Sequence, residues 1–278
     1  MKVTIVCFSQ TGNTRQVAEA MKQSFVSAGF EARSLPIRGA RTEELLEADV
    51  IGVGTPAFLS RAPTPIREFL RGQPELSPRR GFVFATAGYA PGRVLSDMTK
   101  LLQKRGVNVA GGFMGRGEVH HPAPVLRGRL SGRPNAADLA DAANFASALA
   151  EHLKGGREGL VDGSRPDTLS AGFGFYNVVG AVGADWFVRL SVPKPRLDTE
   201  KCTKCGWCVE ECPVGNISMD PYPVLAGQCI RCYRCLNDCP EEAFSANWKW
   251  GNIAPWMLYN ETFERWFGEV RSEKASAG

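Results

Sequence analysis

Eight of the nine cysteines in this chain fall between Cys202 and Cys239, in two short runs of the same design. Each run has the spacing C-x2-C-x2-C-x3-C and is followed directly by proline. Zinc sites take four ligands, usually as two close pairs with a longer gap between them. Three closely spaced thiolates and a fourth one turn later are instead typical of a cubane [4Fe–4S] cluster. Structural zinc and disulfides are the weaker alternatives.

The two runs are expected to complete each other. A short loop can wrap three corners of a cubane, but the fourth corner faces away and needs a ligand from another segment. In this bacterial pattern the fourth cysteine of each run binds the cluster of the other run. We expect one cluster to be bound by Cys202, Cys205, Cys208 and Cys239. We expect the other to be bound by Cys229, Cys232, Cys235 and Cys212.

With these runs, residues 195–247 resemble the bacterial two-cluster ferredoxins. Small residues between the ligands, such as Gly206, let backbone N–H groups approach the cluster sulfurs and tune the reduction potential. Trp207 departs from the simplest members of that family, where a small residue is often found. Shielding of a cluster, a docking role and simple packing are the alternatives for this side chain.

A polar loop, SQTGNT, lies between an expected strand at 3–9 and an expected helix at 13–29. It matches neither the Walker pattern G-x4-G-K-S/T nor the three spaced glycines of dinucleotide loops. A strand–turn–helix can hold one phosphate monoester through the N–H groups at the start of the helix. A plain helix cap is the alternative. The residues expected at the phosphate are Ser9, Gln10, Thr11, Gly12, Asn13 and Thr14.

Two further loops each carry one aromatic residue among glycines and other small residues. Residues 54–63 follow the third expected strand, and residues 86–93 follow the fourth. Ligands of open α/β sheets bind at the carboxyl ends of parallel strands, so a flat ring could be held here against exposed backbone. The residues expected at the ring are Thr55, Pro56, Ala57, Phe58, Thr86, Ala87, Gly88 and Tyr89.

Strand and helix patterns alternate along the first 155 residues. Apolar runs predict strands at 3–9, 31–37, 49–56, 81–88 and 108–117, and helical periodicity predicts helices at 13–29, 65–72, 92–106 and 135–156. Such alternation predicts a doubly wound parallel sheet with helices on both faces.

Residues 1–154 resemble flavodoxin, with Ser9 in place of the first threonine of its commoner T-x-T-G-x-T loop. The resemblance implies the strand order 2-1-3-4-5. It also implies FMN, with its phosphate on the loop at 9–14 and its ring between the two aromatic loops.

Four parts are expected along the chain. Residues 1–156 form the flavodoxin-like FMN-binding domain, and residues 157–193 form a linker and a connector helix. Residues 194–247 form a small α+β ferredoxin-like domain with two [4Fe–4S] clusters. Residues 248–278, which hold four of the six tryptophans, form a tail expected to pack back on the body.

The formal net charge of +4 is small, and no block of lysine and arginine suggests nucleic-acid binding. No signal peptide is apparent, and residues 169–192 are too interrupted by polar residues for a membrane span. We therefore expect a cytoplasmic protein, with membrane contact a minority alternative. Cys7 is expected in the core, and His120, in a loop after the fifth strand, is kept only as a wall of the flavin site.

The whole chain resembles the flavodoxin–ferredoxin fusion proteins of the iron–sulfur flavoprotein type. This resemblance implies an electron-transfer protein that passes low-potential electrons between two [4Fe–4S] clusters, FMN and redox partner proteins. The alternative is a flavin-dependent reductase, in which the clusters load FMN to reduce a small organic substrate. A non-redox scaffold is the third alternative. We identify no catalytic residue, so enzymatic activity stays open, and a homodimer would favour the reductase.

Overall fold

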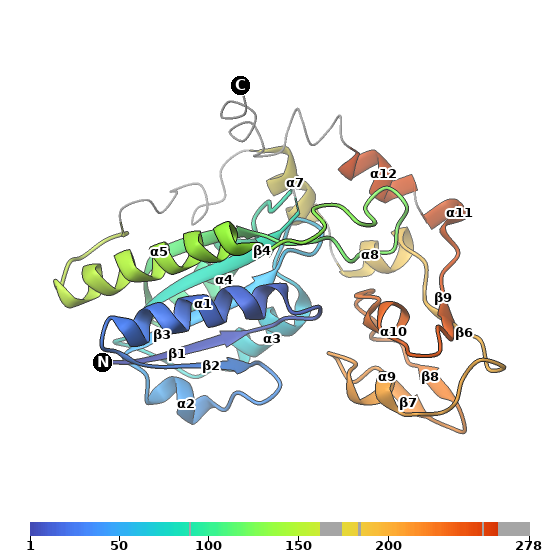
Figure 1. Ribbon diagram of the computed structural model, residues 1–278, viewed down its shortest axis with the longest axis horizontal. Helices are drawn as coiled ribbons and strands as arrows, with labels where there is room; N and C mark the ends of the chain where they lie inside the picture. The colour runs from blue at the N-terminus through green and yellow to red at the C-terminus, as the bar shows by residue number, and fades with distance from the viewer. Residues whose placement is uncertain (89, 162–173, 183–184, 252, 261–278) are drawn as a thin grey trace. The chain divides into compact units, whose positions relative to one another are not determined.

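The structure is a computed structural model (Figure 1), and it describes residues 1–88, 90–161, 174–182, 185–251 and 253–260. The chain divides into two compact units. The first comprises Met1–Glu118 and Leu130–Val182, and the second comprises Val119–Arg129 and Gly183–Gly278. These bounds differ from the expected parts, because residues 119–129 group with the cysteine-rich unit. No helix of the described residues is long and apolar enough to cross a membrane.

The first unit is built on a five-stranded sheet. Its strands are β1 (Lys2–Cys7), β2 (Glu31–Pro36), β3 (Val50–Pro56), β4 (Arg80–Ala87) and β5 (Asn108–Arg116). They are ordered β2-β1-β3-β4-β5, and every neighbouring pair is parallel. This is the flavodoxin-like doubly wound order, so the predicted fold and strand order are confirmed. The strands β3 and β4 are almost wholly buried, which explains their continuous apolar runs.

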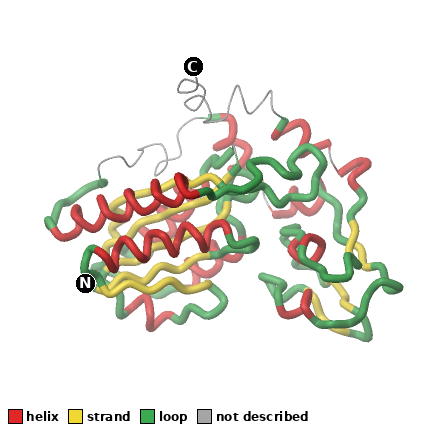
Figure 2. The backbone as a smooth tube through the Cα atoms, viewed as in Figure 1, coloured by secondary structure: helices red, strands yellow, loops and turns green. Residues whose placement is uncertain are grey.

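Helices cover both faces of this sheet, as the red segments of the tube in Figure 2 show. The helices of the first unit are α1 (Asn13–Ser27), α2 (Thr42–Leu46), α3 (Thr64–Gly72), α4 (Val94–Gln103), α5 (Ala136–Lys154) and α7 (Phe175–Val182). The helices α1 and α5 pack together, and α3 packs against α4. Four of these helices match the prediction to within a few residues. The short α2 was not predicted.

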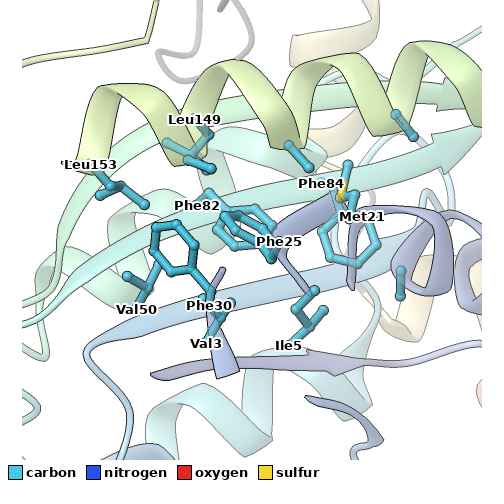
Figure 3. Close-up of a cluster of buried hydrophobic side chains, with 14 of the residues drawn as sticks. Val3, Ile5, Met21, Phe25, Phe30, Val50, Phe82, Phe84, Leu149 and Leu153 are labelled. Carbon is cyan, nitrogen blue, oxygen red and sulfur yellow. The ribbon is translucent and has the colours of Figure 1, made fainter. Parts of the chain in front are cut away.

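The core between the sheet and helices α1 and α5 contains a group of phenylalanine rings among aliphatic side chains (Figure 3). The rings of Phe25 and Phe82 lie 5.5 Å apart, and both side chains are fully buried. A Cβ on Gly52 of β3 would lie 2.4 Å from the Phe82 ring, and one on Gly54 would lie 2.1 Å from the Phe84 ring. Glycine is therefore required at both β3 positions. This packing fixes β3 and β4, whose carboxyl ends carry the two aromatic loops.

The second unit repeats one motif around its cysteines. In chain order its elements are α8 (Asp185–Ser191), β6 (Arg196–Leu197), α9 (Trp207–Glu210), β7 (Ile217–Met219), β8 (Pro223–Leu225), α10 (Arg234–Asn237), β9 (Phe244–Ser245), α11 (Trp248–Gly251) and α12 (Ile253–Tyr259). The strand β6 pairs antiparallel with β9, and β7 pairs antiparallel with β8. Strand, cysteine run and short helix thus occur twice, and each half pairs with the other.

Candidate functional site

The two cysteine runs share one backbone conformation. Lys204 and Arg231, at equivalent positions, have φ of 59° and 57°. Gly206 and Tyr233, two residues further along each run, have φ of 81° and 58°, and each is the N-cap of the following short helix. These left-handed residues curl each run tightly and bring its first three cysteines near one another. The sequence repeat is therefore also a repeat of local structure.

One group of thiols lines an open hollow of about 310 Å³. Its cysteines are Cys202, Cys205, Cys208 and Cys239, so three come from the first run and one from the second. The pKa of the Cys208 thiol is raised to about 11, first by burial and then by the nearby thiols of Cys202, Cys205 and Cys239. The structure thus brings together the four residues expected to bind the first cluster.

A second group of thiols gathers beside the first. Burial is the largest cause that raises the pKa of Cys232 to about 12, and the thiols of Cys229 and Cys212 raise it further. The pKa of Cys235 is also raised, by burial first and then by its neighbours, which include Cys229, Cys232 and Cys212. Cys212 belongs to the first run in the sequence, but it lies near the cysteines of the second run. The crossed ligand scheme expects it there.

Backbone amides donate to the sulfurs of both crossing cysteines. The Asn216 N–H donates to Cys212 Sγ at 3.2 Å, and the Ala243 N–H donates to Cys239 Sγ at 3.4 Å. The two bonds are equivalent in the repeat, since each donor lies four residues after its cysteine. Such N–H···S bonds stabilise a thiolate and help to set the potential of a cluster.

Arg234, in α10, connects the two runs ahead of their crossing cysteines. Its guanidinium lies 2.5 Å from the Glu211 carboxylate and 3.7 Å from that of Asp238. Glu211 directly precedes Cys212, and Asp238 directly precedes Cys239. The side chain is three-quarters buried, so these ion pairs are partly protected from solvent.

The donor set fits an iron–sulfur cluster. All eight candidate ligands are thiols, which suit soft metals and iron–sulfur clusters. Among the described residues, no group of three or more His, Cys, Asp or Glu side chains is placed to hold a metal ion. The four cysteines of the first group instead line one open hollow, where their thiols could bind a cluster.

The polar loop at 9–14 lies at the carboxyl end of β1 and the start of α1. Gly12 is the N-cap of α1 and has a φ of 98°, a conformation that favours glycine. The hydroxyl of Thr14 is buried and lies 2.8 Å from that of Thr86 at the end of β4. Ser9 Oγ accepts from the Arg15 N–H at 3.2 Å. These contacts give the loop a defined shape, while residues 9–13 remain partly exposed.

A segment after β5 borders this loop. The Asn13 side chain donates from Nδ2 to the Glu118 carbonyl oxygen at 3.0 Å. A Cβ on Gly117 would lie 3.0 Å from the same Nδ2 atom. His120, kept from the sequence as a wall of the flavin site, belongs to the second unit, where its carbonyl oxygen accepts from Asn237 Nδ2 at 2.7 Å.

The two aromatic loops of the first unit are tied together. The Ala57 N–H donates to the Thr86 carbonyl at 2.9 Å, and Ser60 Oγ donates to the Ala90 carbonyl at 3.0 Å. Leu59 and Ser60 are left-handed, with φ of 46° and 58°, in a tight turn closed by backbone bonds between Phe58 and Arg61. Tyr89 lies outside the described residues.

The residues predicted to bind the phosphate and the flavin ring of FMN, where described, therefore lie at one edge of the sheet, at the carboxyl ends of its strands. The loop at a helix N-terminus offers N–H groups, hydroxyls and an amide, which suit a phosphate monoester. The loops after β3 and β4 are buried or partly buried where the structure describes them, and they lie at the carboxyl ends of strands, where a flat ring would bind. Cys7, just ahead of the loop, is buried in the core, and burial raises its pKa to about 12.

An aromatic cluster in the second unit was not predicted. The ring of Tyr233 lies 5.0 Å from that of His121 and 5.3 Å from that of Trp248, and the last two rings are 5.4 Å apart. We call these three residues the aromatic cap. A comparison of the runs position by position could have found Tyr233, because the first run has Gly206 there. Nothing in the sequence around His121 indicated that it would join the cluster.

Comparison with known proteins supports the nature of the second unit. Residues 195–218 match the family model of the 4Fe-4S binding domain. Over 55 residues, or 19% of its length, the chain is 38% identical to pyruvate synthase subunit PorD of Methanocaldococcus jannaschii. The match spans 64% of that protein, less than two thirds of its length.

Solved structures similar to the first unit include several flavodoxins. One, from the domain Archaea, is 21% identical, covers 55% of this chain and 99% of its own, and has a TM-score of 0.43. The flavodoxin of Streptococcus pneumonia TIGR4 is 19% identical, covers 54% and 99%, and has the same TM-score of 0.43. Rubredoxin oxygen:oxidoreductase from Desulfovibrio gigas is 18% identical, covers 55% and 36%, and has a TM-score of 0.45. These values are low, so the fold assignment rests on the strand order.

Proposed function

We propose that the chain is an electron-transfer iron–sulfur flavoprotein, with two [4Fe–4S] clusters in its second unit and FMN on its first. The fold and the match to the 4Fe-4S binding domain support electron transfer in general. The relay between clusters and flavin is the finer part of the proposal. The observation that carries the cluster assignment is the hollow lined by Cys202, Cys205, Cys208 and Cys239. This hollow brings together thiols from both runs.

The chain's own residues would act by holding and shielding the cofactors. The thiolates bind iron, the N–H groups of Asn216 and Ala243 stabilise two of them, and Arg234 connects the two runs. Clusters supply one-electron transfer and FMN supplies one- or two-electron transfer when bound. The loop from Ser9 to Thr14 would bind the phosphate of FMN, and the loops after β3 and β4 would hold its ring.

We further propose that redox partner proteins supply and remove the electrons, and that the protein works in the cytoplasm, where thiols stay reduced. Membrane and nucleic-acid partners are not part of this proposal.

The test is an anaerobic preparation analysed for iron, sulfide and flavin. We expect about eight irons, about eight sulfides and about one FMN per chain. Reduction of the clusters by dithionite should be followed by bleaching of the flavin absorbance within the same molecule, independent of protein concentration. Zinc in place of iron, or an absence of flavin after reconstitution with excess FMN, would contradict the proposal.

A further inference from the structure

The two cysteine runs differ in a way that their shared backbone makes clear. Gly206 and Tyr233 are equivalent N-cap residues, both with left-handed φ. Glycine adopts this conformation readily, whereas it costs other residues about 1–2 kcal/mol. A strained residue of this kind persists where its surroundings hold it in place. Favourable contacts of the Tyr233 side chain must therefore offset the cost of its left-handed backbone, a cost that Gly206 in the first run does not have.

The surroundings of Tyr233 provide these contacts. Its side chain is 1% exposed, and its hydroxyl donates to the Pro193 carbonyl oxygen at 2.7 Å. Its ring packs against His121 from the 119–129 segment and Trp248 from α11, which complete the aromatic cap. Three separate segments of the second unit thus converge on the residue that directly follows Cys232.

The first run is open at the equivalent place. A Cβ on Gly206 would meet nothing within 4 Å, and Cys205, which precedes Gly206, is exposed. The open hollow of about 310 Å³ lies here, with Thr203 and Trp207 on its lining. The thiol group of the first run therefore borders solvent on a side where the second run is covered by aromatic rings.

We propose that the two clusters are inequivalent, and that external carriers exchange electrons with the second unit through the cluster of Cys202, Cys205, Cys208 and Cys239. The aromatic cap keeps water from the cluster of Cys212, Cys229, Cys232 and Cys235, which exchanges electrons inside the protein. The inference rests on the proposed function. In each external step one electron leaves a reduced cluster and reduces a one-electron carrier protein, or the reverse.

Two physical reasons favour this division. An external carrier can approach closely only where no side chains stand between it and the cluster. A cubane also becomes more negative on reduction, so exclusion of water disfavours the reduced form and lowers its potential. Tyr233 is thus a positioning residue that acts through solvent exclusion.

The electron port can be tested with a matched pair of variants. Thr203 and Ile230 occupy equivalent positions, but only Thr203 is on the lining of the hollow of the first run. Reduced holoprotein is mixed with hexaamminecobalt(III), which takes one electron to become cobalt(II), and cluster oxidation is followed by stopped flow. Thr203→Trp should slow oxidation several-fold, and Ile230→Trp should leave it unchanged. Equal slowing, or greater slowing by Ile230→Trp, overturns the inference.

The aromatic cap is tested by midpoint potentials, which do not depend on activity. Tyr233→Gly restores the residue of the first run, relieves the left-handed strain and admits water. In an EPR-monitored redox titration it should raise the midpoint of one cluster only, the one whose signal is lost in Cys232→Ala. Tyr233→Phe keeps the ring and should leave both midpoints unchanged.

Unchanged midpoints in Tyr233→Gly, or an equal shift in Tyr233→Phe, would contradict the role of the cap. A preparation that binds no clusters contradicts the proposed function itself, whereas two clusters that react equally contradict only this inference.

Discussion

The guanidinium carbon of Arg234 lies 5.7 Å from the centre of the Trp207 ring, and the two residues occupy equivalent positions in the two cysteine runs. They therefore meet where the halves of the repeat face each other. A guanidinium over an indole face forms a cation–π contact, for which Trp is the most favourable ring. Trp207 also packs in the small apolar core of the second unit, with Cys208, Ile217 and Phe244. This tryptophan, unusual among simple ferredoxins, is thus part of the contact between the runs.

Arg234→Gln should weaken the assembly of both clusters. The change removes the charge that pairs with Glu211 and Asp238 and lies over Trp207. The Glu211 and Asp238 carboxylates are each more than a third exposed, so these ion pairs contribute about 1 kcal/mol or less, and we expect a small fall in the thermal midpoint. Iron should also be lost faster to a chelator, with signals from both clusters declining together. Arg196→Gln, at an exposed position in β6, is the control. Loss restricted to one cluster would show that Arg234 does not link the runs.

Cys239→Ala should damage the cluster of the first run, although Cys239 belongs to the second. The reason is its place in the hollow with Cys202, Cys205 and Cys208. Cys212→Ala should damage the other cluster, because Cys212 lies with Cys229, Cys232 and Cys235. Iron analysis and EPR of the reduced proteins distinguish the two outcomes. If each variant lost only the cluster of its own run, the crossed ligand scheme would be wrong.

Much of the second unit could be predicted from spacing alone. Eight cysteines in a repeated pattern indicate which thiols should group, and the structure brings the same residues together. The bridge from Arg234 to Glu211 and Asp238 could not be predicted, because it depends on how the two halves face each other. In the sequence, Tyr233 is unusual only because the equivalent residue of the first run is Gly206. This difference is visible only when the two runs are compared.

The first unit was predictable for a different reason. Continuous apolar runs such as β3 indicate buried parallel strands, but the strand order came from the resemblance and not from periodicity. The helix α2 has five residues, too few to show a helical period. Residues 119–129 group with the second unit through contacts such as the hydrogen bond from Asn237 Nδ2 to the His120 carbonyl oxygen, which a loop without periodic pattern does not indicate.

Gly12→Ala should lower the affinity for FMN. The residue has a φ of 98° at the start of α1, so a side chain there costs about 1–2 kcal/mol and shifts the loop from its shape. Gly29→Ala is a matched control, since Gly29 has a φ of 80° and open space around it, but lies at the far end of α1. Both variants should lose similar stability, and only Gly12→Ala should raise the Kd in a flavin-fluorescence titration. Equal Kd values for the two variants would show that the loop at 9–14 does not bind FMN.

His121→Phe should make the second unit less sensitive to acid. Burial lowers the pKa of His121 to about 4, and its Nδ1 accepts the Ala123 N–H at 3.2 Å, which also requires the neutral ring. The unfolded chain therefore binds a proton that the folded chain does not between about pH 6.5 and about pH 4. The neutral, buried His121 therefore costs no stability above about pH 6.5. The folded state loses stability relative to the unfolded state as the pH falls from about 6.5 to about 4.

The measurement compares thermal midpoints of the wild-type holoprotein and the variant at pH 7.5 and at pH 5.5. Phenylalanine keeps an apolar ring beside Tyr233 and Trp248 and cannot take up a proton, so its midpoint should fall less on acidification. His152→Phe controls for removal of a buried histidine, because His152 lies in α5 of the first unit. An equal fall in wild type and His121→Phe would mean that acid acts on other groups, the cluster thiolates among them.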